Sequence, residues 1–320
     1  MYWRANWFPF LLIVAFFFVI LQPQADDAKK NAAQSAAADC WTGAGANQIP
    51  VTAAGNEIRY GRSLIENTSY YFGPKGIIAP VSNGMNCQNC HLEAGTKPWG
   101  NNYGGVASTY PKYRNRSGTI EDIEKRVNDC FERSLNGQAI NNSGREMKAI
   151  VAYIKWLGSD VPKNSRPKGS GIMSLKNPDR AADPLKGTMV YTNTCARCHG
   201  ATGEGKKNPN DTGYAYPPLW GNNSYNTGAG MYRLSSLAGY ALNNMPHPRT
   251  YHDPELTVEQ AWDVAAYINS QPRPVMKLDK DWPDISKKPV DYPFGPYADV
   301  FSEQQHKYGP WGMMKKEGKK

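Results

Sequence analysis

Apolar residues recur at helical spacing in two well-separated segments of the chain. In the first segment, five of them stand at i, i+3, i+4, i+7 and i+10, namely Met147, Ile150, Val151, Ile154 and Leu157. In the second segment a similar stripe lies within 260–270, namely Trp262, Ala265, Ala266 and Ile268. Such spacing predicts helices with one buried face. The related strings Val151-Ala-Tyr-Ile and Ala265-Ala-Tyr-Ile mark corresponding turns, so the chain repeats one domain design.

Each repeat also opens with a short helical pattern, at 57–65 and at 183–191. We expect domains over 45–160 and 183–272. The segment between them, 161–182, is rich in Pro, Gly, Ser and Lys, which is typical of a linker. From 273 to 320 the chain is Pro-rich but dense in Trp, Tyr and Phe, so we expect it to wrap the domains, with only 315–320 loose.

An apolar block at 7–21 follows Arg4 and precedes the first acid, Asp26, which comes after the small residue Ala25. This pattern over 1–26 predicts an export signal. The uncharged stretch 5–25 is also long enough to span a bilayer, so an uncleaved anchor is the alternative. Either segment would send the rest of the chain across a membrane into an oxidising compartment, which we expect to be the periplasm.

Composition narrows the class of protein further. Hydrophobic residues make up 40% of 320 residues, which is enough for two cores and excludes an intrinsically disordered chain. Six Cys are too few for a disulfide scaffold. The net charge of +9 favours anionic partners. Nucleic acid is not expected among them, because no motif combines aromatic with basic residues and the export signal argues against it.

Four of the six Cys and two of the five His fall into two identical patterns, Cys87-Gln-Asn-Cys90-His91 and Cys195-Ala-Arg-Cys198-His199. This CxxCH pattern is the one for covalent attachment of a c-type haem. Two thiols at this spacing reach the two vinyl groups of one porphyrin, and the adjacent histidine binds the iron. The two pairs stand too far apart for a zinc site. The flanks lack the strands of a redox CxxC motif. We therefore expect two covalently bound haems.

The outer iron ligands have few candidates, because His is scarce. For the second haem we expect Met245, which precedes a proline after a Gly-rich loop. Met231, His247 and a plain core role for Met245 are the alternatives. The first domain has no similar Met-Pro loop, and its Met147 belongs to a buried stripe.

The first domain instead offers Cys130, on a helix that Thr119 can cap and Gly137 can end. At 3.6 residues per turn, Arg126, Cys130 and Ser134 share one helix face, and a neighbouring guanidinium promotes thiolate formation. A disulfide with Cys40 is an equal alternative. For Arg116, Arg126 and Arg133 the alternative is a solvated face or pairing with haem propionates.

The chain resembles the thiosulfate dehydrogenases, two-haem c-type cytochromes that join two thiosulfates into tetrathionate. The resemblance covers most of the exported part. Its strings are Asn86-Cys-Gln-Asn-Cys-His-Leu92, Tyr110-Pro-Lys-Tyr-Arg-Asn-Arg116, Cys130-Phe-Glu-Arg-Ser-Leu-Asn-Gly137, Tyr216-Pro-Pro-Leu-Trp-Gly221, Gly228-Ala-Gly-Met-Tyr-Arg-Leu234, Asn244-Met-Pro246, Asp291-Tyr-Pro-Phe-Gly-Pro-Tyr297 and Gln305-His-Lys-Tyr-Gly-Pro310. It implies a mainly α fold, in which two class I cytochrome c-like haem domains are joined by a linker and followed by an extended, wrapping C-terminal tail.

The resemblance also implies roles for individual residues. It assigns His91 and Cys130 to the first iron and His199 and Met245 to the second. Residues that match those around the family's substrate site are Asn115, Arg116, Arg126 and Ser134. Some relatives carry a lysine just before the methionine, where this chain has Asn244. The implied partners are thiosulfate, tetrathionate and a cytochrome c or similar periplasmic acceptor. The alternatives are the reverse reaction and a pure electron carrier.

Overall fold

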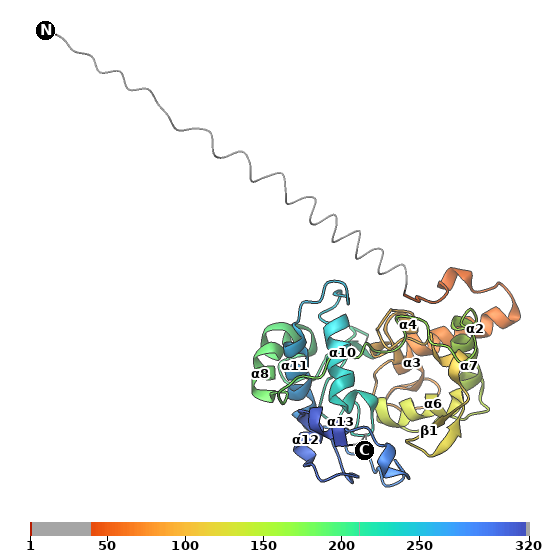
Figure 1. Cartoon of the computed structure of the whole chain (residues 1–320). Coiled ribbons are helices and arrows are strands. Elements are labelled where there is room, and N and C mark those ends of the chain that lie inside the picture. The colour runs from red at the N-terminus through yellow and green to blue at the C-terminus, as the bar shows by residue number, and fades with distance from the viewer. Residues whose placement is uncertain (2–39, 211, 318–320) are drawn as a thin grey trace. The chain divides into compact units, whose positions relative to one another are not determined.

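The computed structural model describes residues 1, 40–210 and 212–317 (Figure 1). The chain divides into two units at residue 40, and both haem-attachment motifs belong to the second, 41–320, which is compact. The signal or anchor expected over 1–26 lies outside the described residues, apart from Met1. No helix in the described part has both the length and the apolar character that a membrane span requires.

Helices dominate the second unit. In chain order the α-helices are α2 (Ala53–Glu66), α3 (Thr68–Phe72), α4 (Leu92–Gly95), α5 (Val106–Thr109), α6 (Ile123–Asp129), α7 (Arg145–Leu157), α8 (Pro184–Val190), α9 (Ala196–His199), α10 (Leu234–Asn244), α11 (Val258–Ser270), α12 (Glu303–Tyr308) and α13 (Gly312–Glu317). Two short antiparallel hairpins complete it, formed by β1 (Lys112–Arg114) with β2 (Thr119–Glu121) and by β3 (Lys206–Lys207) with β4 (Tyr214–Tyr216).

Each domain is built on a pair of helices that meet at a glycine. In the first, α2 packs against α7, and a Cβ on Gly61 would lie 1.9 Å from the carbonyl oxygen of Ala149. In the second, α8 packs against α11, and a Cβ on Gly187 would lie 2.0 Å from the carbonyl oxygen of Asp263. A side chain at either glycine would push the helices apart. Figure 1 shows both pairs, and the expected repeat of one domain design is confirmed.

The two apolar stripes are buried as predicted. On α7 every residue of the stripe is at most 5% exposed, from Met147 at 0% to Val151 at 5%. On α11 every residue of the stripe is at most 3% exposed, and the ring centroid of Trp262 lies 5.2 Å from that of Trp311 in the tail. Met147 is a core residue, in agreement with its place in the stripe.

The helix that leads to Cys130 begins later than predicted. Thr119 is in β2, where it pairs with Arg114, so the residues that follow it continue a strand and do not start a helix. Asp122 caps α6 instead, because its carboxylate accepts a hydrogen bond from the N–H of Lys125 at 2.7 Å. The chain leaves the helix at Asn136, which has a φ of 42°, and the N–H of Gly137 then bonds to the carbonyl oxygen of Phe131 at 2.9 Å.

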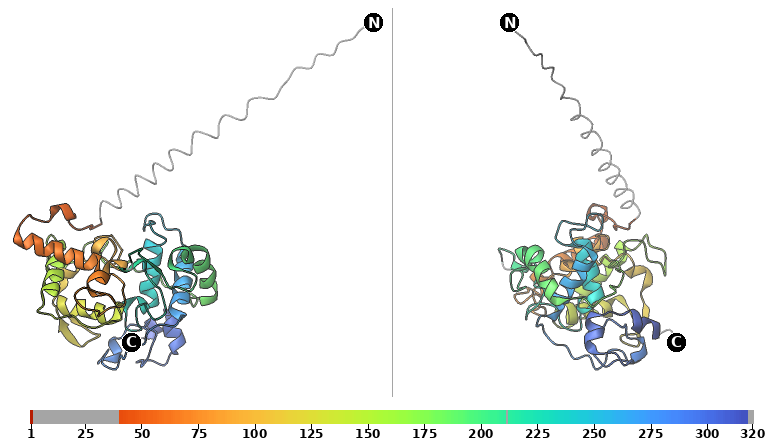
Figure 2. Two further views of the ribbon diagram at one scale, coloured as in Figure 1. Left: turned by 180° about the vertical axis from the view of Figure 1, so that it is seen from behind. Right: turned by 60° about the vertical axis from the view of Figure 1, so that its left-hand side comes forward.

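The tail contacts both domains (blue in Figure 2). The N–H of Trp282 donates to the carbonyl oxygen of Arg116 in the first domain at 2.7 Å. The N–H of Ala182 in the linker donates to the carbonyl oxygen of Tyr308 at 2.8 Å, and Arg233 in the second domain donates to the Asp291 carboxylate at 2.5 Å. The prediction that 315–320 is loose begins too early, because α13 continues to Glu317.

Hydrogen bonds also join the two domains directly. Asn226 Nδ2 donates to the carbonyl oxygen of Glu132 at 2.8 Å, and Tyr240 Oη donates to that of Asn89 at 3.1 Å. Asn226 is only 3% exposed, so its bond is shielded from water. These contacts fix the wall between the two haem cavities.

Candidate active site

Both motif histidines are oriented as iron ligands. With Nδ1 as donor, His91 bonds to the carbonyl oxygen of Asn101 at 2.5 Å and His199 to that of Pro217 at 2.8 Å. This tautomer leaves Nε2 for a metal. Burial lowers the pKa of His91 to about 4 and also lowers that of His199, so both rings are neutral, as iron ligation requires. Since each ring also lines a cavity beside the cysteines of its own motif, the residues fit a c-type haem in each domain.

The first cavity has a volume of about 340 Å³ and is lined by Cys87, Cys90 and His91. The three residues expected on one helix face, Arg126, Cys130 and Ser134, line the same cavity. Cys130 carries a free thiol, so the disulfide alternative is not formed in the described part of the chain. The fold thus brings a thiol, a guanidinium and a hydroxyl to the wall of the first haem cavity.

Cys130 opens a π-helical turn, Cys130–Ser134, that continues α6. The N–H of Leu135 bonds to the carbonyl oxygen of Cys130, five residues back, at 2.9 Å. Turns of this kind are wider than an α-helix and frequently mark functional sites. A second π turn, Tyr191–Cys195, ends on the first cysteine of the second motif. Each domain therefore presents one cavity cysteine from a π turn. The α-helical spacing of 3.6 residues per turn, on which the prediction for Cys130 rests, does not predict such a turn.

Positive charge gathers around the first cavity. The charge of the Cys130 sulfur raises the pKa of Arg126. Three further cations line the same cavity, although the sequence does not predict them there, namely Lys112, Arg114 and Arg166. Burial, followed by the charges of Arg166 and Arg114, lowers the pKa of Lys112 to about 8. The wall is thus suited to anions.

A signal for two of these cations was present in the sequence. Residues 112 and 114 share one face of a strand, and the residue between them faces the other way. Tyr113 is 60% exposed, in agreement with that alternation. Arg166 lies in the irregular linker, where no periodic pattern places a side chain.

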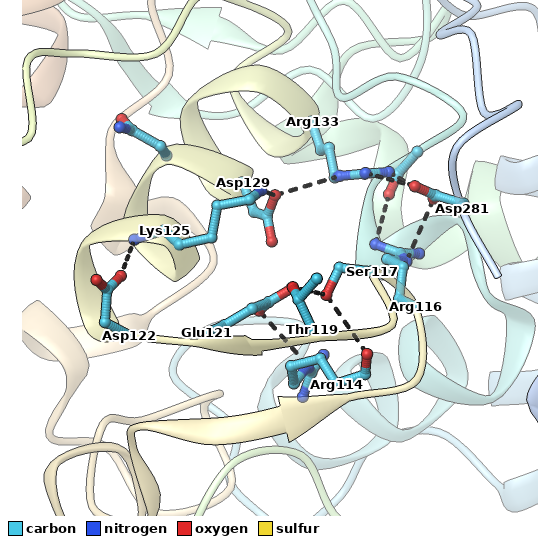
Figure 3. Close-up of polar contacts among 12 residues, drawn as sticks. Arg114, Arg116, Ser117, Thr119, Glu121, Asp122, Lys125, Asp129, Arg133 and Asp281 are labelled. Carbon is cyan, nitrogen blue, oxygen red and sulfur yellow. Dashed lines mark hydrogen bonds and ion pairs between the residues drawn. The ribbon is translucent and has the colours of Figure 1, made fainter. Parts of the chain in front are cut away.

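Arg116 and Asn115 are not among the residues that line the cavity. The Arg116 guanidinium donates to the Tyr292 hydroxyl at 2.7 Å and to the carbonyl oxygen of Gly228 at 3.1 Å, and lies 3.5 Å from Asp281. Figure 3 shows Arg116 and Arg133 converging on Asp281. Asn115 is exposed in the β1–β2 turn. Their assignment to the substrate site therefore rests on the resemblance alone.

The second cavity has a volume of about 580 Å³ and holds Cys195, Cys198 and His199 on its wall. The three candidate outer ligands all line it, namely Met231, Met245 and His247. The two cavities also share residues, which are Met85, Asn86, Cys90 and Met231. The haem sites are therefore separated by a single layer of side chains.

Comparisons with known proteins agree with this geometry. Residues 79–162 match the family described as SoxA/TsdA, cytochrome c domain, and residues 185–272 match Cytochrome c. The thiosulfate dehydrogenase of Psychrobacter arcticus is 37% identical over 239 residues, which cover 74% of this chain and 69% of that protein. That of Allochromatium vinosum is 37% identical over 233 residues, which cover 72% of this chain and 83% of that protein.

A solved structure is also similar, that of the thiosulfate dehydrogenase (TsdBA) from Marichromatium purpuratum. The TM-score is 0.68 at 32% identity, over 76% of this chain and 51% of that one, so this chain spans about half its length. Two cytochrome c domains with intact motifs mean that the chain carries two covalently bound c-type haems. On these grounds the chain belongs to the thiosulfate dehydrogenase family.

Proposed function

We propose that the protein joins two thiosulfate dianions into tetrathionate in the first haem cavity. In this reaction one bond forms between the two outer sulfurs and two electrons leave, while no bond to oxygen changes and no proton moves. The observation that carries the proposal is the free thiol of Cys130, which lines the cavity together with Arg126 and Ser134. The names of the relatives support thiosulfate as the substrate.

Eight residues would hold the two haems. They are Cys87, Cys90, His91 and Cys130 for the first, and Cys195, Cys198, His199 and Met245 for the second. Each haem, when bound, stores one electron, so two of them match the two electrons released. A thiolate ligand lowers a haem's potential and a thioether raises it, so Cys130 and Met245 favour transfer from the first haem to the second.

The cations of the cavity make the meeting of two dianions possible. Arg126 offsets the repulsion between them by charge-assisted hydrogen bonds, and its planar guanidinium suits a sulfonate edge. The Ser134 hydroxyl donates a further bond, and the positive charges of Lys112 and Arg114 draw anions toward the cavity. Arg116 contributes from outside the wall, because its bonds hold the β1–β2 hairpin that carries these two cations.

Once bound, the two haems would carry these electrons across the shared wall to an external acceptor, a cytochrome c or a similar protein. The two haem-attachment motifs and the expected N-terminal signal support the periplasm as the compartment of this reaction. Electrons would leave the protein from the second domain, because its cavity adjoins the first at four shared residues, Met85, Asn86, Cys90 and Met231.

One assay tests the proposal. Purified holoprotein is given thiosulfate and ferricyanide, and tetrathionate is measured. We expect turnover in the wild type, its loss in Cys130→Ala, and its retention in Cys40→Ala, which removes a thiol outside the cavity. Unchanged turnover in Cys130→Ala would refute the site proposed here.

A further inference from the structure

A lysine of the first domain lies in the cavity of the second haem. Lys97 follows α4, in the loop after the first attachment motif, and is 7% exposed. No other lysine or arginine of the described residues is as buried. Its side chain lines the second cavity together with His199 and Met245. The first domain therefore contributes a cation to the haem site of the other domain.

The backbone of this loop holds Lys97 firmly in place. Its carbonyl oxygen accepts hydrogen bonds from Asn102 Nδ2 at 2.9 Å and from the N–H of Gly100 at 3.0 Å. Two residues further on, the carbonyl oxygen of Trp99 accepts a bond from Asn244 Nδ2 at 3.1 Å. The loop is thus tied to the residue that precedes Met245.

The ammonium group itself lacks a protein partner. Lysine is almost never buried unless it is paired, yet across 40–210 and 212–317 the Nζ of Lys97 has no hydrogen bond and no carboxylate within ion-pair distance. Glu93, which lines the same cavity, is the charge that acts on it most directly. Burial lowers the pKa of Lys97, and Glu93 opposes this shift. The protein therefore leaves the Lys97 charge to interact with what fills the cavity, which is the second haem.

We propose that Lys97 raises the reduction potential of the second haem and so directs electrons from the first haem to the second. A fixed positive charge in a poorly solvated cavity favours the form of the cofactor that holds one more electron. The electron gained by the second haem is the one that the first haem loses. The inference depends on the two-haem architecture and not on thiosulfate as substrate. It can therefore fail while the proposed function holds, and it can hold while the proposed function fails.

The test is a redox titration of the full-length holoprotein, followed by haem absorbance, which resolves two one-electron waves. We expect Lys97→Gln to lower one midpoint so that electron transfer between the haems becomes about tenfold less favourable, which is about 59 mV. Lys97→Arg should keep that midpoint, and Glu93→Gln should raise it. Lys186→Gln removes the same charge from an exposed position of the second domain and should move neither wave.

Cys130→Met assigns the waves, because a thioether in place of a thiolate raises the potential of the first haem. The wave that Lys97→Gln lowers must be the one that Cys130→Met leaves in place, and any other result overturns the inference. Mass spectrometry confirms two haems in each variant. If Lys97→Gln does not accumulate as holoprotein, Glu93→Gln decides: a raised midpoint supports the inference and an unchanged one overturns it.

Discussion

Asp281 accepts hydrogen bonds from both terminal nitrogens of Arg133, each at 2.8 Å (Figure 3). The pair is largely shielded from water, with side-chain exposures of 11% and 8%. Arg133 belongs to the π turn that begins at Cys130, whereas Asp281 belongs to the tail. The tail therefore holds the turn that carries the candidate iron ligand.

Asp281→Asn should destabilise the protein, because it removes the carboxylate that holds both Arg133 and Arg116 and leaves Arg133 with only its longer contact to Asp129 at 3.8 Å. We expect a loss of about 3 kcal/mol in the free energy of unfolding, measured by chemical denaturation of the holoprotein. Glu57→Gln breaks the exposed pair with Arg145 and should cost less than about 1 kcal/mol. Equal effects of the two variants would show that the tail does not secure the π turn.

Gly61→Ala should disrupt the first domain, because the added methyl would lie 1.9 Å from the carbonyl oxygen of Ala149. We expect a loss of about 3 kcal/mol or more, since backbone atoms cannot yield as a side chain can. Gly312→Ala is the matched control, because nothing lies within 4 Å of its Cβ position. Thermal unfolding of both variants measures the difference, and similar midpoints would contradict the proposed helix contact.

Arg126→Gln should lower kcat/KM for thiosulfate roughly ten- to hundredfold, because one charge-assisted hydrogen bond to the substrate contributes about 1.5–3 kcal/mol. Arg145→Gln removes an arginine from an exposed pair with Glu57 and should leave kcat/KM unchanged. Steady-state oxidation of thiosulfate with ferricyanide measures both. A wild-type value in Arg126→Gln would remove this residue from the substrate site.

The pKa of Lys112, lowered to about 8 by burial and by the charges of Arg166 and Arg114, predicts a pH dependence. As the pH rises through about 8, Lys112 loses its proton and the cavity loses one positive charge. Binding of the thiosulfate dianion then weakens, so kcat/KM should fall above that pH. In Lys112→Gln this fall should be absent and kcat/KM should be low throughout. If kcat/KM of the variant still fell above that pH, Lys112 would be excluded as the group that causes the fall.

The outer ligand of the second haem can be tested among the three residues that line its cavity. Met245→Ala should convert the second haem to a high-spin form, since it removes the proposed sulfur ligand. Met231→Leu and His247→Gln should keep the low-spin spectrum. Absorption and electron paramagnetic resonance spectra distinguish these outcomes, and a high-spin haem in either of the last two variants would reassign the ligand.

The helical pairs and the cofactor sites were predictable from the sequence because both depend on local signals. The stripe from Met147 to Leu157 follows from helical period, and the attachment motifs follow from the fixed spacing of two thiols and an imidazole. The face shared by Arg126, Cys130 and Ser134 was also predictable, although the π turn that presents Cys130 was not. No local pattern distinguishes a π turn from the α-helix that it continues.

Contacts between distant segments were not predictable. Nothing in the sequence near Arg116 indicates that Tyr292 and Asp281 engage its guanidinium, or that Lys97 lies in the cavity of the other domain. The cap of α6 was misplaced for a related reason. Thr119 and Asp122 both favour helix starts, and the pairing of Thr119 with Arg114 decides between them.

The wall that the two cavities share has a consequence for how the molecule matures. Met85, Asn86 and Cys90 come from the first domain and Met231 from the second, so neither porphyrin pocket is closed until both halves of the chain have met. A gene that split the two modules would leave each with an open side. The two haem domains of this chain therefore form one cooperative unit around both cofactors, and neither is an independent haem-binding domain.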